Sequence, residues 1–318
     1  MKITVIGCGR WGSLIAWYLD SIKHQVILYG RESSKNMQRF LVDRKNDLLQ
    51  LPDSIVLSTN LECINESEVI VISVNSQGLQ SLMDEVKVLD PQNKIFILCM
   101  KGIEISTGRR LSQIANDNLD YSNDLAVWLG PGHVQEFYKG IPNCMVIDSN
   151  NQAVKKLLVE SFSSNLIRFY YGQDLIGNEI GAAAKNVIGI AAGMLDGLNL
   201  STLKGALMSR GTREVARLIK AVGGNELSAY GLCHLGDYEA TIFSMFSHNR
   251  QFGESFVKNE LYTELAEGYY TVKALMNLGK NYGVDLPISS AVYDILYQQK
   301  NAKDALVNLF TRSLKNEF

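Results

Sequence analysis

The sequence predicts an α/β protein of two domains: a doubly wound sheet domain over residues 1–175 and an all-helical domain over residues 176–318. Short apolar, β-branched runs alternate with helical patterns as far as about residue 175, which is typical of a parallel sheet covered by helices. Beyond residue 178 the pattern is almost entirely helical. A chain of 318 residues is long enough for two such cores.

Composition and charge indicate a globular protein that binds neither nucleic acid nor membranes. Hydrophobic residues make up 46% of the chain and charged residues 20%, the net charge is −2, and basic residues form no run. No apolar stretch approaches the length of a membrane span. The five cysteines are widely spaced, mostly within apolar runs, which is typical of reduced core thiols rather than disulfides or a zinc site. We therefore expect a soluble, cytoplasmic protein without a bound metal.

A glycine-rich motif follows the first apolar run. Residues 2–6 lead directly into residues 7–12, GCGRWG, and a helical pattern comes next. In the order strand, GxGxxG, helix, this motif predicts a Rossmann-type dinucleotide site. Gly7 allows a tight turn, Gly9 lets the backbone approach a pyrophosphate, and Gly12 lets the helix pack on the strand. The helix N-terminus would bind the phosphates; a glycine-rich turn without a ligand is the alternative.

The end of the second strand, at residues 25–29, bears on the choice of cofactor. A site that prefers NAD usually has Asp or Glu there, on the ribose hydroxyls. Here Gly30 removes that carboxylate and Arg31 offers a partner for a 2′-phosphate. We therefore expect NADP(H) to be favoured, and the nearby Glu32 keeps NAD(H) open.

Further elements of the sheet domain are expected from apolar and amphipathic patterns, whereas residues 34–65 are polar and uneven. The strands are expected at residues 69–74, 94–100, 125–129, 144–148 and 166–171, with helices at 79–88 and 151–162. Lys101 falls just past the strand at 94–100. Because ligands bind at the carboxyl edge of such sheets, this lysine is a candidate to meet a substrate; a solvated loop lysine is the alternative.

The helical segment of residues 178–193 is the most informative part of the chain. It is alanine-rich, lacks proline, and has Asn178 as a candidate N-cap. Lys185 is the single charged residue between 180 and 195, and such a charge is costly unless it has a partner or a task. Glycines share its four-residue row, so something is expected to approach this face closely. They are Gly177, Gly181, Gly189 and Gly193. The alternative is tight helix packing with Lys185 reaching solvent.

Further helices are expected at residues 203–222, 264–282 and 289–299. A second polar cluster, residues 236–241 with residues 247–253, lies between the first two of these helices. Its small polar side chains beside glycine predict a loop that recognises an anion such as phosphate.

Together these motifs resemble the bacterial type of NAD(P)-dependent glycerol-3-phosphate dehydrogenase over essentially the whole chain. The glycine fingerprint alone is shared by many enzymes, but the lysine–asparagine helix, the Gly236-Asp237 pair and residues 247–250 are specific in this order. The matching stretches include residues 7–12, 101–104, 130–136, 140–142, 178–188, 210–211, 235–237, 249–250, 267–268, 286–288 and 291–293. The resemblance implies a Rossmann-type domain followed by a helical domain like that of 6-phosphogluconate dehydrogenase.

The resemblance also implies a reaction. A hydride passes reversibly between NAD(P)H and dihydroxyacetone phosphate, giving sn-glycerol 3-phosphate for phospholipid synthesis, in what is often a homodimer. Lys185 matches the general acid/base and Asp237 the residue that positions it. Lys101 matches a second lysine near the reacting oxygen, and Asn186 and Thr241 match groups that orient the substrate.

The implied contacts come from both domains. Cofactor contacts are implied for Gly7, Gly9, Arg10, Trp11, Gly12, Arg31, Lys101, Val134, His248 and Glu267. Substrate contacts are implied for Lys101, Gly130, Gly132, Lys185, Asp237, Ser247, His248 and Asn249.

The sequence departs from the family pattern at three places. His248 stands where arginine is usual, and histidine lacks the bidentate guanidinium fork and carries a charge only over part of the pH range. A dianionic phosphate would raise the pKa of His248, which would make substrate binding pH-dependent, and Arg250 is an alternative phosphate ligand. Gly132 replaces a serine whose hydroxyl is expected near the substrate, and Asn75 replaces a proline.

Two other functions remain open. One is a related 2-hydroxyacid or sugar-phosphate dehydrogenase of the same superfamily, which would turn over another keto compound and not dihydroxyacetone phosphate. The other is a non-catalytic dinucleotide-binding sensor. Such a sensor has no need of an acid/base set, so the joint presence of Lys101, Lys185, Asn186, Asp237 and Thr241 argues against it.

Overall fold

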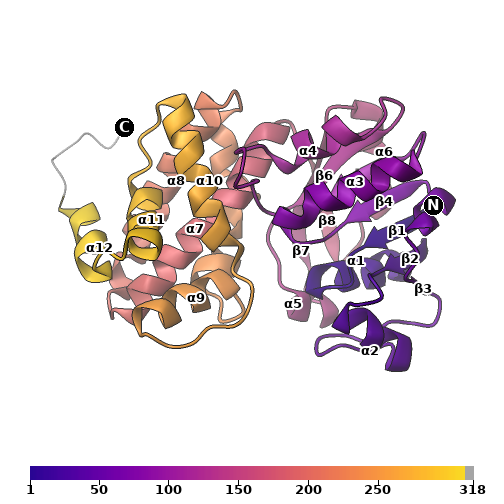
Figure 1. Cartoon of the computed structure of the whole chain (residues 1–318), viewed down its shortest axis with the longest axis horizontal. Coiled ribbons are helices and arrows are strands. Elements are labelled where there is room, and N and C mark those ends of the chain that lie inside the picture. Colours follow the sequence, from indigo (N-terminus) through magenta and orange to yellow (C-terminus); the bar gives the residue numbers. More distant parts are fainter. Residues whose placement is uncertain (312–318) are drawn as a thin grey trace. The chain divides into compact units, whose positions relative to one another are not determined.

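The computed structural model describes residues 1–311, which divide into two compact units (Figure 1). The first unit comprises Met1–Lys101 and Arg109–Leu175, and the second comprises Gly102–Gly108 and the described residues from Ile176 on. The sequence predicts a single boundary near residue 175, with 102–108 in the first domain. This segment instead belongs to the helical unit, because its fully buried Ile103 packs in the core of that unit.

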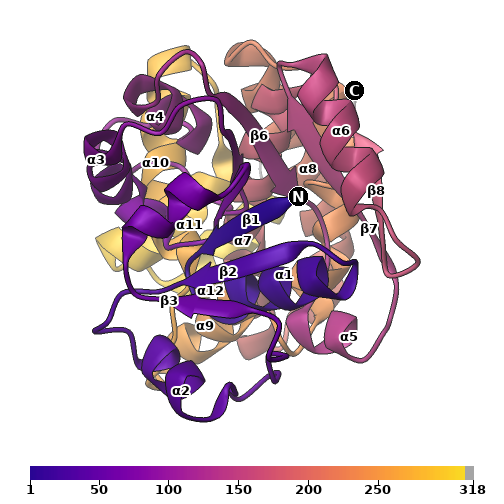
Figure 2. The same cartoon turned by 90° about the vertical axis from the view of Figure 1, so that its right-hand side faces the viewer.

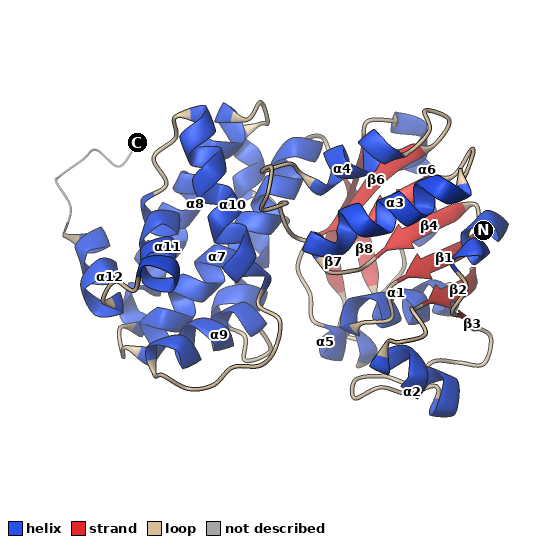
Figure 3. Cartoon of the chain, viewed as in Figure 1, coloured by secondary structure: helices blue, strands red, loops and turns tan. Residues whose placement is uncertain are grey.

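The first unit is built on an eight-stranded sheet, which confirms the predicted doubly wound fold (Figure 3). The strand order is β3-β2-β1-β4-β5-β6-β7-β8, and all neighbours are parallel except β6 and β7. The strands are β1 (Lys2–Ile6), β2 (Gln25–Tyr29), β3 (Val56–Ser58), β4 (Val69–Ile72), β5 (Ile95–Leu98), β6 (Asp124–Leu129), β7 (Asn143–Ser149) and β8 (Ile167–Tyr171). Figure 2 shows β1, β2 and β3 side by side.

Helices cover both faces of this sheet. Because connections between parallel strands are right-handed, α1, which joins β1 to β2, and α3, which joins β4 to β5, lie on opposite faces. The helices of this unit are α1 (Arg10–Ser21), α2 (Lys35–Asp43), α3 (Leu79–Leu89), α4 (Leu111–Asn118), α5 (Val134–Tyr138) and α6 (Gln152–Phe162). Helix α2 and strand β3 occupy the uneven stretch in which the sequence shows no clear pattern.

The second unit is helical throughout the part that the structure describes, as predicted. Its helices are α7 (Leu175–Gly197), α8 (Lys204–Ala221), α9 (His248–Val257), α10 (Glu267–Tyr282), α11 (Pro287–Gln298) and α12 (Ala302–Phe310). Helix α7 is buried from Gly177 to Leu195, as its apolar character on all sides requires. The predicted N-cap is wrong, because α7 begins at Leu175 and Asn178 lies inside it.

The glycine row of α7 accommodates other parts of the same unit. A Cβ atom on Gly189 would lie 2.7 Å from Thr241 Cγ2, and one on Gly193 would lie 1.9 Å from the carbonyl oxygen of Arg250. The predicted close approach is therefore made by α9 and the segment before it. Tight helix packing thus accounts for these glycines, but Lys185 is 6% exposed and does not reach solvent.

No helix within residues 1–311 is both long enough and apolar enough to cross a membrane.

Candidate active site

The glycine-rich turn of the first unit has the close contacts that its motif requires. Gly7 has a φ of 109°, and a Cβ atom there would lie 2.2 Å from the carbonyl oxygen of Ser73 at the end of β4. A Cβ atom on Gly12 would lie 1.9 Å from the carbonyl oxygen of Gly7. A Cβ atom on Gly9, by contrast, would have no atom of the described chain within 4 Å. The turn is therefore tight at Gly7 and Gly12 and open at Gly9, as a pyrophosphate cradle should be.

The N-terminus of α1 completes this cradle. Gly9 is the N-cap and, in the described part of the chain, no side chain caps the helix there. The first N–H groups of α1 and its dipole therefore favour a diphosphate at this position. Arg10 and Trp11 open the helix, and the Trp11 ring lies 6.1 Å from the ring of Phe137. These residues fit a dinucleotide.

The carboxyl ends of β5 and β6 bring other predicted residues together. Lys101 follows β5, and its Nζ donates a hydrogen bond of 2.7 Å to the carbonyl oxygen of Gly130, which follows β6. Val134 is buried at the start of α5. Gly132 has a φ of 146°, and a Cβ atom there would lie 2.2 Å from Phe137 Cε2. Glycine at 132 is thus required by backbone and packing, and no side chain fits there without a shift of Phe137.

The centre of the second unit is the Lys185 ammonium group on α7. Its Nζ lies 2.8 Å from Asp237 Oδ2 and donates a hydrogen bond of 2.7 Å to Thr241 Oγ1. The Thr241 hydroxyl in turn donates to the backbone carbonyl of Asp237 at 2.7 Å. All three residues are buried. The buried charge that the sequence predicts is therefore compensated by a carboxylate and fixed in direction by a hydroxyl.

The partners of Lys185 come from an irregular stretch before α9. Leu235–Asp237 forms a 3₁₀ turn and Glu239–Phe243 a π-helical turn. π-Helical turns are rare overall, but they are frequent at functional sites. Here the two turns direct Asp237 and Thr241 towards the same lysine.

Asn186 is linked to the start of two further helices. Asn249 Nδ2 donates to Asn186 Oδ1 at 3.1 Å, and Asn249 Oδ1 accepts from the backbone N–H of Gly268 at 2.9 Å. Glu267 is the first residue of α10. Ser247 is the N-cap of α9, where its Oγ accepts from the Arg250 N–H. The prediction of a loop at residues 247–253 is therefore wrong, because residues 248–257 form helix α9. The N-terminus of this helix lies beside Asn186.

His248 and Arg250, the two candidates for the phosphate, have different surroundings. The His248 ring is half-buried, and its Nδ1 is 2.7 Å from the hydroxyl of Tyr262. Arg250 is buried, with its Nε 2.7 Å from Asp196 Oδ2 and its Nη2 3.2 Å from Glu254. Movement of Arg250 to a ligand would break both ion pairs, so His248 is the better candidate. Nothing in the sequence pattern around Tyr262 indicates its contact with His248.

A buried histidine that the sequence does not single out supports the Asp237 segment. His234 Nδ1 donates to the carbonyl oxygen of Gly181 on α7 at 2.8 Å, so its Nε2 accepts from the Tyr238 hydroxyl at 2.7 Å. The second contact requires a neutral imidazole, because Nε2 can accept a hydrogen bond only when it carries no proton. Burial lowers the pKa of His234 from 6.5 to about 4, and the nearby Lys185 charge acts in the same direction.

This pKa makes the stability of the second unit pH-dependent. The unfolded chain binds a proton at His234 below pH 6.5, whereas the folded chain does so only near pH 4. The free energy of unfolding should therefore fall by about 3 kcal/mol as the pH drops from 6.5 to 4, at about 1.4 kcal/mol per pKa unit. Denaturant unfolding of wild type and His234→Gln should show a stability difference that shrinks over this range. For His24→Gln, at a half-buried site, the stability difference from wild type should change less with pH. Parallel pH profiles of stability for wild type and His234→Gln would contradict the lowered pKa of His234.

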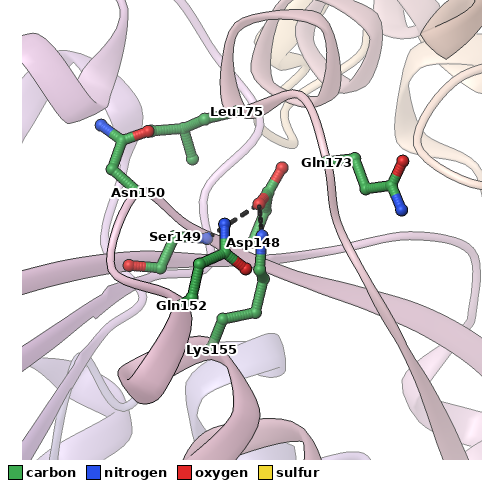
Figure 4. A pocket seen from close by; sticks show the side chains of 7 residues that line it. All are labelled: Asp148, Ser149, Asn150, Gln152, Lys155, Gln173 and Leu175. Carbon is green, nitrogen blue, oxygen red and sulfur yellow. Dashed lines mark hydrogen bonds and ion pairs between the residues drawn. The ribbon is translucent and has the colours of Figure 1, made fainter.

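A polar depression of about 340 Å³ lies elsewhere in the first unit, beside the C-terminal ends of β7 and β8 (Figure 4). Its buried Lys155 is 3.3 Å from Asp148 Oδ1 and donates to the carbonyl oxygen of Gly172 at 2.6 Å. Asp148 Oδ2 accepts from the backbone N–H of Asp174. Because β7 runs antiparallel to β6, this depression is at the sheet edge opposite Gly7. These charges are used to hold the chain between β8 and α7.

The fold and these residues define a class: dinucleotide-dependent oxidoreductases with a Rossmann-type unit and a helical unit. Models of the N- and C-terminal parts of NAD-dependent glycerol-3-phosphate dehydrogenase match residues 2–155 and 174–307. This chain belongs to the NAD-dependent glycerol-3-phosphate dehydrogenase family.

Individual relatives agree with this family. The glycerol-3-phosphate dehydrogenase (NAD(P)+) of Thermoanaerobacter sp. (strain X514) is 34% identical, over 100% of this chain and 99% of that protein. The crystal structure of glycerol-3-phosphate dehydrogenase from Coxiella burnetii superposes with a TM-score of 0.91 at 26% identity, over 98% of this chain and 99% of that chain. A ketopantoate reductase from Ralstonia eutropha, at 13% identity and a TM-score of 0.63, shares the fold alone.

Proposed function

We propose that this chain interconverts dihydroxyacetone phosphate and sn-glycerol 3-phosphate with NAD(P)(H). The observation that carries the proposal is the buried Lys185 ammonium, held by Asp237 and Thr241 next to Asn186, in a chain of this family. A bound NAD(P)H supplies the hydride. Lys185 donates the proton that the C2 oxygen of the ketone needs as it becomes a hydroxyl, and takes it back in the reverse direction.

The neighbours of Lys185 hold it for this transfer. Asp237 and Thr241 each bond the Lys185 ammonium and so fix its direction. Asn186, whose amide is hydrogen-bonded to Asn249, would bind a substrate oxygen. Both Asp237 and Thr241 come from one irregular stretch, so a change in either is expected to affect the position of the proton donor.

The start of α9 is the proposed site of the substrate phosphate. The N–H groups of its first turn and its helix dipole favour an anion, and His248 and Asn249 stand at its first two positions after the Ser247 cap. The other implied contacts are proposed in the same way. Substrate contacts from the first unit are Lys101, Gly130 and Gly132, and cofactor contacts are Gly7, Gly9, Arg10, Trp11, Gly12, Arg31, Lys101 and Val134, with His248 and Glu267 from the second unit.

His248→Arg is expected to lower the KM for dihydroxyacetone phosphate severalfold above pH 7 and to leave kcat within about twofold. Arginine offers a permanent charge and a bidentate fork, whereas histidine is charged only over part of this pH range. The KM of wild type should therefore rise more steeply than that of the variant between pH 6 and 8.5. If the KM of wild type and that of the variant depend on pH in the same way, His248 does not bind the substrate phosphate.

The reaction itself is tested by NADH and NADPH oxidation with purified protein and dihydroxyacetone phosphate, with the configuration of the product determined enzymatically. We expect turnover to sn-glycerol 3-phosphate. Turnover of another keto compound but not of dihydroxyacetone phosphate would instead indicate a different dehydrogenase of the superfamily. Nucleotide binding without turnover of any substrate would indicate a sensor.

We further propose a cytoplasmic homodimer that favours NADP(H), accepts NAD(H), and supplies glycerol phosphate for phospholipid synthesis. The five cysteines are thiols rather than disulfides, which fits a reducing compartment. Sedimentation of the purified protein tests the dimer, and the ratio of kcat/KM for NADPH and NADH tests the cofactor preference.

A further inference from the structure

The end of β2 leaves no room for the carboxylate that usually selects NAD. A Cβ atom on Gly30 would lie 2.5 Å from Cys8 Sγ and 2.9 Å from Met37 Cε. Both of these neighbours are buried, so an Asp or Glu at position 30 would displace core side chains. Any charged side chain that contacts the ribose of the cofactor at this end of the strand must therefore come from another position in the chain.

Two opposite charges from different elements meet at this place. Arg31, directly after Gly30, has its Nη2 2.5 Å from Oε1 of Glu85 on α3. The side chains are 59% and 44% exposed, so both face solvent at the carboxyl edge of the sheet. Tyr29, the last residue of β2, lies close to both. Its pKa is raised by burial and then by the Glu85 charge, while Arg31 opposes the shift.

We propose that Glu85 sets the nucleotide selectivity of this chain by neutralising Arg31 and weakening the binding of nucleotides that carry a 2′-phosphate. This inference rests on the proposed function in one respect, that the first unit binds NAD(P)(H). Arg31 is the cation that a 2′-phosphate would contact, and the Glu85 carboxylate both competes for its guanidinium and repels the incoming phosphate.

The physical basis is the weakness of the Arg31–Glu85 pair. Ion pairs with more than a third of each side chain exposed are screened by solvent and exchange partners readily. A 2′-phosphate can therefore displace Glu85, so NADP(H) still binds, but each binding event leaves a carboxylate beside a dianion. Glu85 thus lowers, without reversing, the preference for NADP(H) that Arg31 provides.

The test measures how tightly the full chain binds adenosine nucleotides that correspond to one half of the dinucleotide cofactor. It needs no turnover. Calorimetric titration with adenosine 2′,5′-bisphosphate and with ADP compares a 2′-phosphate with a free 2′-hydroxyl. Glu85→Gln should tighten the 2′,5′-bisphosphate by about fivefold and change ADP by less than about twofold. Asp84→Asn is the matched control, because Asp84 is exposed on the same helix, bonds Gln80, and carries the same charge.

Arg31→Gln should weaken the 2′,5′-bisphosphate, and Glu85→Gln should then have no effect in the Arg31→Gln background. If Asp84→Asn tightens the binding of the 2′,5′-bisphosphate equally, the effect is due to net charge alone, and this result would overturn the proposal. Weaker binding of the 2′,5′-bisphosphate to Glu85→Gln would also overturn the proposal, because it would mean that Glu85 holds Arg31 in place for the phosphate. Unchanged binding would overturn it as well. Failure of both nucleotides to bind wild type would instead contradict the dinucleotide site itself, and normal nucleotide binding without ketone turnover would contradict only the proposed reaction.

Discussion

Replacing Lys185 with methionine is expected to lower kcat for dihydroxyacetone phosphate reduction by about 10²- to 10⁴-fold, because the variant lacks the proposed proton donor to the C2 oxygen. Methionine keeps an unbranched apolar stem like that of lysine but lacks the ammonium group. Nucleotide binding should be retained, because most of the proposed cofactor contacts lie in the first unit. Steady-state rates with saturating NADPH, together with NADPH binding by fluorescence, measure both quantities.

The control for this variant is a second substitution. Lys185→Met alone leaves Asp237, which is 1% exposed, as a buried charge without its cation, and loss of one partner of such a pair costs about 3–5 kcal/mol. Lys185→Met/Asp237→Leu removes both charges and should recover most of this stability without recovering activity. A folded, nucleotide-binding Lys185→Met protein with kcat within tenfold of wild type would contradict the role of Lys185.

Gly193→Ala is expected to lower the free energy of unfolding by about 3 kcal/mol, because the new Cβ atom would lie 1.9 Å from the carbonyl oxygen of Arg250. The carbonyl oxygen belongs to the backbone and the position of the Cβ atom is fixed by the backbone, so the clash cannot be relieved by rotating a side chain. Helices α7 and α9 must move apart, which also strains the ion pair between Asp196 and Arg250. Urea unfolding followed by circular dichroism measures the loss.

Gly205→Ala is the matched control for Gly193→Ala. Gly205 lies in the first turn of α8, and a Cβ atom on it would have no atom of the described chain within 4 Å. Its replacement by alanine should leave stability unchanged or raise it slightly, since alanine favours helix. Similar losses for the two variants would show that helix propensity or refolding, not the α7–α9 contact, is being measured.

The order of elements could be predicted because it depends on local patterns. Apolar runs such as residues 69–74 and the GxGxxG turn at 7–12 contain their own structural signals, and the structure places strands and a helix there. Helix α9 was not predictable in this way. Its polar residues and Gly253 weaken the pattern, yet this glycine is there for packing: a Cβ atom on it would lie 2.1 Å from the carbonyl oxygen of Ile190 on α7.

The candidate site was predictable only in part, for a related reason. A single charge in an apolar helix indicates that Lys185 has a partner, but not which one. The contacts with Asp237 and Thr241 span more than fifty residues of chain and depend on a 3₁₀ turn and a π-helical turn that have no sequence pattern of their own. In the same way, the pairing of His248 with Tyr262 follows from tertiary packing.

The measurement that tests the central claim most directly is the single-turnover rate of hydride transfer in Lys185→Arg. Arginine keeps the positive charge beside Asp237 but does not release a proton near neutral pH. If Lys185 acts by donating its proton, the rate at saturating NADPH and dihydroxyacetone phosphate should fall by at least about 100-fold, with nucleotide binding retained. A rate within tenfold of wild type would show that a positive charge alone is sufficient, and would contradict the assignment of Lys185 as the acid.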